Sequence, residues 1–295
     1  ALSSAASDVY KRQDLGKAIR LLSKADSKWY VSSDAANALA ARVALFQNKM
    51  TDAANYAEAV LANSSFSLAS TAMDFSKNWV AGSSSPEIIF AYVNNSRASS
   101  PLNFTLYVND TDGSWNYAPS DWCYNSLFAD DNTLSRKGDV RLKATFTSQD
   151  ANRVIKYPNG TYQLAETSDY TCTPVVISRI SEMYLIKAEA LGKTNGAAAL
   201  VEYMKKRYTT APSEAAIKAL SDKEYQTLIL DERRREFYAE GMRWQDIKRT
   251  NRLELLETLD GRTYLMYYPI PQDEIDMAGT VAYPQNPGYA GYTGN

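Results

Sequence analysis

The chain of 295 residues has 32 basic and 34 acidic side chains, and a net charge of −2 supplies no strong field that would attract nucleic acid or an anionic membrane surface. It contains no histidine, which excludes His-dependent catalytic triads and histidine metal clusters. Cys123 and Cys172 are too few for a zinc site, and they are either free thiols or one bridge. We therefore expect no metal and no cofactor. No apolar run approaches the length of about 20 residues that spans a bilayer.

A pair of helices is predicted between residues 33 and 61. The first helix would begin at Ser33 or Asp34 and the second at Thr51 or Asp52, since these side chains are good N-caps. Small residues lie where the two helices would press together. The positions at helical spacing are Ala36, Leu39, Ala40, Val43 and Phe46 in the first helix, and Ala53, Tyr56, Ala57 and Val60 in the second.

The segment 70–173 has a different composition, rich in Asn, Asp, Ser, Tyr and Trp, and shows no long helical period. A long irregular segment in a compact protein is more often functional than accidental. Its aromatic rings lie among polar side chains, with nearby amides and an arginine that could act as hydrogen-bond partners in a binding site. The alternative is that the rings are buried between loops and helices. The predicted binding residues are Trp79, Trp115, Tyr117 and Trp122, together with Asn94, Asn95 and Arg97.

A second helix pair is predicted from Ile177 to Tyr208, broken between Gly192 and Gly196. Two pairs of about thirty residues suggest tetratricopeptide-like repeats.

The run from Asp231 to Arg249 contains three consecutive arginines, yet six basic residues minus five acidic ones leave a charge of only +1. At about 100° per residue the three arginines would point in three directions. We expect one helix, stabilised by its own charge pairs over a buried Trp244, and no ligand site there. Four prolines between 269 and 287 then predict an extended, docked tail.

Several motifs together resemble the RagB/SusD family of outer-membrane nutrient-binding lipoproteins of Bacteroidetes. They follow one another along most of the chain. They are "DLGKAIRLL" from Asp14, "AANALAARVALFQNKMTDAANYAEAVL" from Ala35, "SPEIIFA" from Ser85, "RKGDVRLKATF" from Arg136, "VVISRISEMYLIKAEAL" from Val175, "ERRREFYAEGMRWQDIKR" from Glu232, "YYPIPQDEI" from Tyr267 and "QNPGY" from Gln285.

The resemblance implies an all-α fold, a tetratricopeptide-like α-α superhelix with an irregular, loop-rich partner subdomain. It implies helices over 14–69, a ligand-facing subdomain over 70–173, and a second helix pair, the arginine-rich helix and the tail over 174–295. Residues 1–13 match nothing in the family and resemble translated adapter sequence, so we expect a non-native or disordered head.

The family's role is to capture oligosaccharides, or in some members peptides, at the cell surface and to deliver them to a SusC-type TonB-dependent transporter, without catalysis. The resemblance implies an outer-membrane location and a lipid anchor on a cysteine upstream of this chain. It implies no nucleic-acid partner.

An enzymatic alternative is a glycosidase with two carboxylates. Asp130 with Asp131, or Asp110 with Asp112, are the adjacent acidic pairs. A glycosidase needs facing carboxyl groups about 5–9.5 Å apart rather than neighbours on one loop, so the sequence favours binding over hydrolysis.

Overall fold

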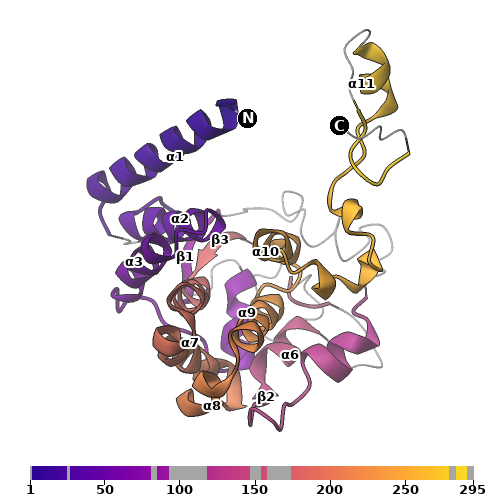
Figure 1. Ribbon diagram of the computed structural model, residues 1–295. Coiled ribbons are helices and arrows are strands. Elements are labelled where there is room, and N and C mark those ends of the chain that lie inside the picture. Colours follow the sequence, from indigo (N-terminus) through magenta and orange to yellow (C-terminus); the bar gives the residue numbers. More distant parts are fainter. Residues whose placement is uncertain are drawn as a thin grey trace, which may run out of the picture. The chain divides into compact units, whose positions relative to one another are not determined.

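The computed structural model (Figure 1) describes residues 2–24, 27–80, 85–92, 118–146, 154–157, 174–278 and 284–290. The chain divides into two compact units, Ala1–Tyr238 and Ala239–Asn295. Helices dominate the described residues, and the few strands are short. The structure confirms the predicted all-α, tetratricopeptide-like class.

The first predicted helix pair is present as α2 (Ser33–Phe46) and α3 (Met50–Leu61). The N-cap of α2 lies one residue before the predicted position, because the Ser32 hydroxyl accepts a hydrogen bond from the Ala35 amide at 3.1 Å. No side chain caps α3. Alanines fill most of the contact between the helices, which lets the two backbones approach closely. The buried apolar positions are Ala35, Ala36, Ala38, Ala40, Ala41, Ala44, Leu45, Ala53, Ala54, Ala57 and Val60, whereas Leu39 and Phe46 are exposed.

The second predicted pair is confirmed as α7 (Ile180–Arg207), which is two helices joined at a kink. Gly192 makes the kink with φ 65 and ψ 175, outside the helical region. The two halves then pack so tightly that a Cβ on Gly196 would lie 2.2 Å from the Ala188 carbonyl oxygen. α7 also packs against α3, so the two helix pairs share one apolar core.

Two short antiparallel sheets join the irregular subdomain to the helices. β1 (Ile88–Tyr92) pairs with β3 (Val175–Arg179), and β2 (Lys137–Asp139) pairs with β4 (Tyr208–Thr210). β1 and β3 lie beside α2 (Figure 1). The first sheet therefore connects residues on either side of the long irregular segment.

In the described part of the irregular subdomain, the remaining elements are single turns. They are α4 (Ala72–Ser76), the 3₁₀ turn η1 (Lys77–Trp79), the π-helical turn η3 (Cys123–Leu127) and α6 (Val140–Thr145). α4 packs against α6. This subdomain is held in place by side-chain contacts more than by regular backbone pairing.

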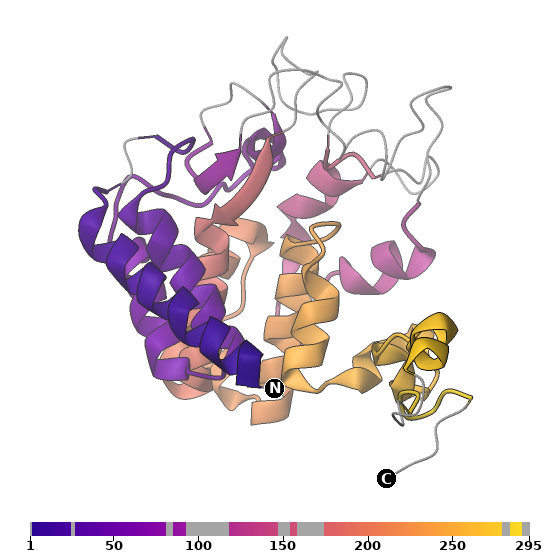
Figure 2. The same ribbon diagram turned by 90° about the horizontal axis from the view of Figure 1, so that it is seen from above.

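The chain begins with a helix, α1 (Leu2–Leu21), which packs against α2 (Figure 2). The structure therefore differs from the disordered head expected over 1–13. Whether those residues are native stays a prediction.

The arginine-rich run is not one helix, which corrects the prediction. α8 (Glu214–Ala219) is followed by α9 (Asp222–Glu236), which starts with a capping box between Ser221 and Glu224. α9 stops at Glu236 and α10 (Met242–Thr250) starts after a turn in which Ala239 and Gly241 have φ of 64 and 76.

The second unit continues from α10 through short turns. They are η4 (Leu253–Leu255), η5 (Glu257–Leu259), η6 (Thr263–Met266) and α11 (Gln272–Met277). The tail is not extended throughout, because it contains α11. Pro271 is compatible with this helix since it lies at the N-cap, where its missing backbone N–H breaks no hydrogen bond of the helix. Gln285 ties the segment together by accepting from the Ile270 amide and donating to its carbonyl. Docking of the tail stays a prediction.

Replacing Gly196 by alanine is expected to lower the free energy of unfolding by about 1–3 kcal/mol, because the new methyl group would collide with the Ala188 carbonyl. Gly16→Ala is the matched control. Gly16 lies in α1, and its nearest neighbour would be 3.7 Å away, so the change should be neutral or stabilising by about 0.5–1 kcal/mol. Urea unfolding of both variants measures the difference. Equal stability of the two would contradict the close packing of α7.

Candidate functional site

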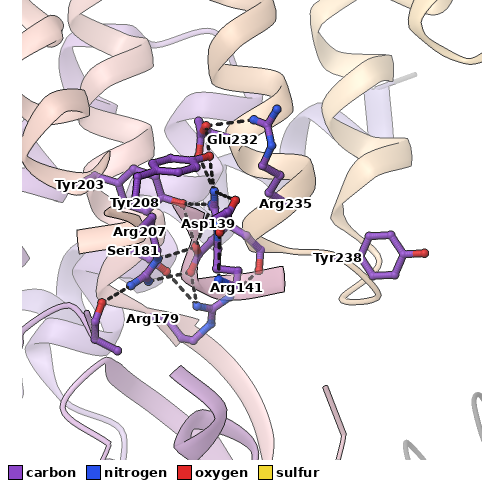
Figure 3. A network of polar contacts seen from close by, with 12 residues as sticks. Asp139, Arg141, Arg179, Ser181, Tyr203, Arg207, Tyr208, Glu232, Arg235 and Tyr238 are labelled. Atoms are coloured by element: carbon purple, nitrogen blue, oxygen red, sulfur yellow. Dashed lines mark hydrogen bonds and ion pairs between the residues drawn. The ribbon is translucent and has the colours of Figure 1, made fainter. Parts of the chain in front are cut away.

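A buried network of charged and hydroxyl side chains lies between α7 and α9 (Figure 3). Its charged members are four arginines and four carboxylates, and none of these side chains is more than 5% exposed. These eight charges balance one another, and the buried Arg136 also donates to the Tyr208 hydroxyl at 3.2 Å. The members are Glu87, Asp139, Arg141, Arg179, Arg207, Glu232, Arg235 and Glu236, with the hydroxyls of Ser181, Tyr203 and Tyr208.

Glu236, at the end of α9, is the centre of one half of the network. Its carboxylate accepts from Arg207 at 2.9 and 3.0 Å and from the Tyr203 hydroxyl at 2.7 Å, and it also pairs with Arg179. Burial alone would raise the pKa of Glu236, but Arg207 and Arg179 outweigh it and hold that pKa well below its ordinary value. Glu236 is therefore an anion fixed in the core.

Arg141 is the centre of the other half. It donates to Asp139 at 2.7 Å and to Glu232 at 2.9 Å, and the Tyr208 hydroxyl lies between it and Glu232. Burial raises the pKa of Tyr208 and keeps the phenol neutral, so it can donate to Glu232 at 2.6 Å. Arg141 thereby joins the irregular subdomain to both α7 and α9.

The network is structural rather than catalytic in its geometry. Each carboxylate faces an arginine, and none is open to solvent, so no acid–base pair there could meet a substrate. The sequence predicts charge pairs along the arginine-rich run, and of the network charges Glu232, Arg235 and Glu236 lie in that run. Arg235 does pair with Glu232 on α9 at 2.9 Å, but Glu236 reaches across to α7 and β3. The missed signal was a charged residue inside otherwise apolar runs, such as Arg179 in "VVISRIS".

The described glycosidase candidates are turn residues. The Asp130 carboxylate accepts from the Gly138 amide at 2.9 Å, and Asp131 accepts from the Thr133 amide at 2.9 Å. Each carboxylate thus accepts a hydrogen bond from a backbone amide of its own loop. Asp110 and Asp112 lie outside the described residues.

Of the predicted binding residues, five lie outside the described residues: Asn94, Asn95, Arg97, Trp115 and Tyr117. The remaining two are Trp79 and Trp122. The structure does not bring these two together in one described site.

Trp79 is buried, which corrects its placement in the binding site. The side chain is 1% exposed, and Lys156 and Arg179 lie over its ring at 4.5 and 5.2 Å from the centroid. Phe75 lies against it at 5.1 Å. A ring enclosed in this way cannot stack on a sugar.

Trp122 is partly exposed at the start of η3, as the binding hypothesis requires. It packs on a hydrophobic cluster made by Leu127, Phe128, Phe146 and Val154. Arg234 of α9 lies over its ring, with the guanidinium carbon 4.2 Å from the centroid. Sequence reasoning did not find this partner, because 112 positions separate the two residues and no local pattern joins them.

The residues after Trp122 include polar groups at the surface. Asn125 and Ser126 are exposed, and Tyr124 packs its ring on Phe146 at 5.5 Å. Burial raises the pKa of Tyr124, so the hydroxyl stays neutral and can donate or accept. The surface around Trp122 thus combines an aromatic ring, a guanidinium and uncharged hydrogen-bonding groups.

Trp244 is 39% exposed, which corrects its prediction as the buried centre of the arginine-rich helix. The break between α9 and α10 changes which residues share a face. Leu230 and Phe237 are buried.

A cleft of about 460 Å³ lies between α1 and the α2–α3 pair. Its cations are Arg12, Lys17, Arg20 and Lys49, with Asp52 as the acidic member. Because Arg12 belongs to the head that the sequence predicts to be non-native, we assign no function to this cleft.

Cys123 is a buried free thiol, and Cys172 lies outside the described residues. Within the described ranges, no cluster of His, Cys, Asp and Glu side chains could hold a metal ion. Among the same residues, no helix is long and apolar enough to cross a membrane.

Comparison with known proteins identifies relatives of one kind. A model described as the SusD family matches residues 128–261. SusD-like protein P38 of Formosa agariphila is 30% identical over 142 residues, which cover 44% of this chain and 27% of that protein. The chain therefore spans about a quarter of the curated relative's length.

Solved structures share the fold at lower identity. A laminarin-binding SusD-like protein aligns with a TM-score of 0.65 at 22% identity, over 97% of this chain and 69% of the other. Surface glycan-binding protein A from Bacteroides thetaiotaomicron aligns with a TM-score of 0.65 at 22% identity, over 94% of this chain and 69% of its own. A SusD-like carbohydrate-binding protein from Bacteroides vulgatus aligns with a TM-score of 0.59 at 20% identity, over 81% of this chain and 50% of its own.

Glu236→Gln is expected to lower the free energy of unfolding by about 3–5 kcal/mol, because buried arginines lose their anion. The folded pKa of Glu236 lies below its unfolded value, so its contribution is full above about pH 4.5 and is lost as the pH falls through the folded pKa. Chemical unfolding between pH 7 and pH 3 should show a weaker acid dependence in the variant. Glu214→Gln, in a surface pair with Lys218, should cost under about 1 kcal/mol. Equal losses in both variants would contradict the role of the network.

Trp79→Ala is expected to lower the free energy of unfolding by about 3–5 kcal/mol, as a core truncation does. Trp244→Ala removes a ring of the same size that is 39% exposed, so it should cost clearly less. Thermal and urea unfolding compare the two variants. A Trp79→Ala protein as stable as Trp244→Ala would show that the first ring is not part of the core.

Proposed function

We propose, from the premise that this chain belongs to the SusD/RagB family, that it binds oligosaccharides at the cell surface. The proposal extends to delivery of the glycan to a SusC-type TonB-dependent transporter of the outer membrane, without catalysis. The proposed location is the outer membrane, with a lipid anchor.

The observation on which the binding site rests is the partly exposed Trp122 with its stacked arginine. Sugars present flat C–H faces to aromatic rings, and their hydroxyl groups need several fixed donors and acceptors. The surface around Trp122 supplies both through its ring, Asn125 and Ser126. Asn94, Asn95, Arg97, Trp115 and Tyr117 remain part of the proposed site.

The relatives support a glycan rather than a peptide as ligand. One structural neighbour is described as laminarin-binding and another as a surface glycan-binding protein. At 22% identity these neighbours support the fold, and the ligand of this chain is our proposal.

Trp122→Ala is expected to weaken glycan binding by about 1–3 kcal/mol, the usual contribution of stacking on an aromatic ring. Affinity gel electrophoresis against a panel of polysaccharides that includes laminarin would identify a ligand, and calorimetric titration would then measure each variant. Trp122→Phe keeps a ring and should retain part of the affinity.

Trp244→Ala is the control, since it removes a partly exposed tryptophan from the other unit and should leave affinity unchanged. Circular dichroism confirms that each variant is folded at the titration temperature, because Trp122 also packs on an aromatic cluster. A folded Trp122→Ala protein with unchanged affinity would place the site elsewhere. Retention by no polysaccharide would contradict glycan binding.

A further inference from the structure

The three consecutive arginines of α9 have three different surroundings. Arg233 and Arg235 are buried, the first over the Phe237 ring at 5.2 Å and the second paired with Glu232. Arg234 is partly exposed and faces the irregular subdomain through Trp122. One arginine of the run is therefore left outside the scaffold.

Among the described residues, the Arg234 side chain has no anionic partner. Its contact with the Trp122 ring is the one ring contact, hydrogen bond or ion pair that this side chain makes with them. Asp121, the acidic residue next to Trp122 in sequence, is exposed and makes no ion pair with it. The guanidinium is thus a fixed positive charge at a partly covered surface.

The stacking on Trp122 determines what this charge can recognise. The guanidinium carbon lies 4.2 Å from the centre of the ring, so the ring covers one side of the group, and its N–H groups make no hydrogen bond to the described residues. Two parallel N–H groups match the two oxygens of a carboxylate, and holding the fork in place reduces the entropy lost on binding. A neutral sugar uses such an arginine less well, because its hydroxyls offer no negative charge.

We propose that the glycan bound by this protein carries a carboxylate, and that Arg234, positioned by Trp122, binds that group. The substrate class is an acidic oligosaccharide that contains hexuronate. This inference rests on the proposed function and narrows it.

The competing location for an anion is the cleft beside α1, which also contains several cations. None of the cations there stacks on an aromatic ring, and Lys17 already lies 3.9 Å from Asp14. Of the cleft cations, Lys49 is the farthest in sequence from the predicted non-native head. Lys49→Gln therefore tests whether the cleft binds the anion.

The test uses binding to matched polymers by affinity gel electrophoresis and calorimetry. The probes are polygalacturonate, alginate and a glucuronate polymer, each beside its carboxyl-reduced form, with laminarin as a neutral glycan. We expect the protein to bind at least one uronate polymer and its carboxyl-reduced form far more weakly. Arg234→Gln should weaken that binding about 10-fold to 100-fold, the usual effect of losing a hydrogen bond to a charged group. Binding by the unchanged protein should fall as salt rises, and less steeply in the variant.

Lys49→Gln should bind like the unchanged protein, and circular dichroism should show both variants folded. The inference would be overturned if Arg234→Gln left uronate binding unchanged, or if the carboxyl-reduced polymers bound equally well. It would also be overturned if Lys49→Gln, and not Arg234→Gln, abolished uronate binding. Each of these results would leave glycan binding itself intact. Binding of neutral glycans alone would do the same. Retention by none of the polymers, laminarin included, would contradict both the proposed function and the inference.

Discussion

Four buried arginines and four buried carboxylates must be brought together before the larger unit of this protein can be stable. Removing a single charge from water costs several kcal/mol, so each of these groups is tolerated only beside its partners. The partners are distant in sequence: Arg207 meets Glu87 across 120 positions, and Arg141 meets Glu236 across 95. Any arrangement in which one of these segments is displaced leaves a buried charge without its partner and is therefore destabilised. In this way the network specifies the fold of segments that have little secondary structure of their own.

The same network explains how an irregular segment can support a binding surface. Arg141 fixes the end of residues 118–146 to α9 through Glu232, and Arg235 donates to the Leu127 carbonyl just beyond Trp122. An aromatic cluster with Phe146 and Tyr238 fills the space between these two anchors. Trp122 is thus held from both sides by α9, although the regular structure next to it is a single π-helical turn. A ring on such a support can keep its orientation without a ligand, which reduces the cost of binding.

The helix pairs could be predicted from the sequence because their signals are local. Alanines at helical spacing and the break at Gly192 depend on neighbours within a few positions, and both pairs are present. The interpretation of single rings and charges failed where the partner is remote. Lys156 and Arg179, which cover the Trp79 ring, are distant from it in sequence, so no local pattern could predict its burial. Trp244 was placed in the core on the assumption of an unbroken helix, which the left-handed residues Ala239 and Gly241 interrupt.

The arginine run shows why a neutral charge count does not settle the role of each residue. Its sum of charges is near zero, yet the helical turn sends Arg233 and Arg235 into the scaffold and Arg234 toward Trp122. Arg234 makes no bond to any of the eight network charges, so its replacement leaves their balance of four against four intact. The proposed contact of Arg234 with a ligand carboxylate is therefore separate in the structure from the charges that hold α7 and α9 together.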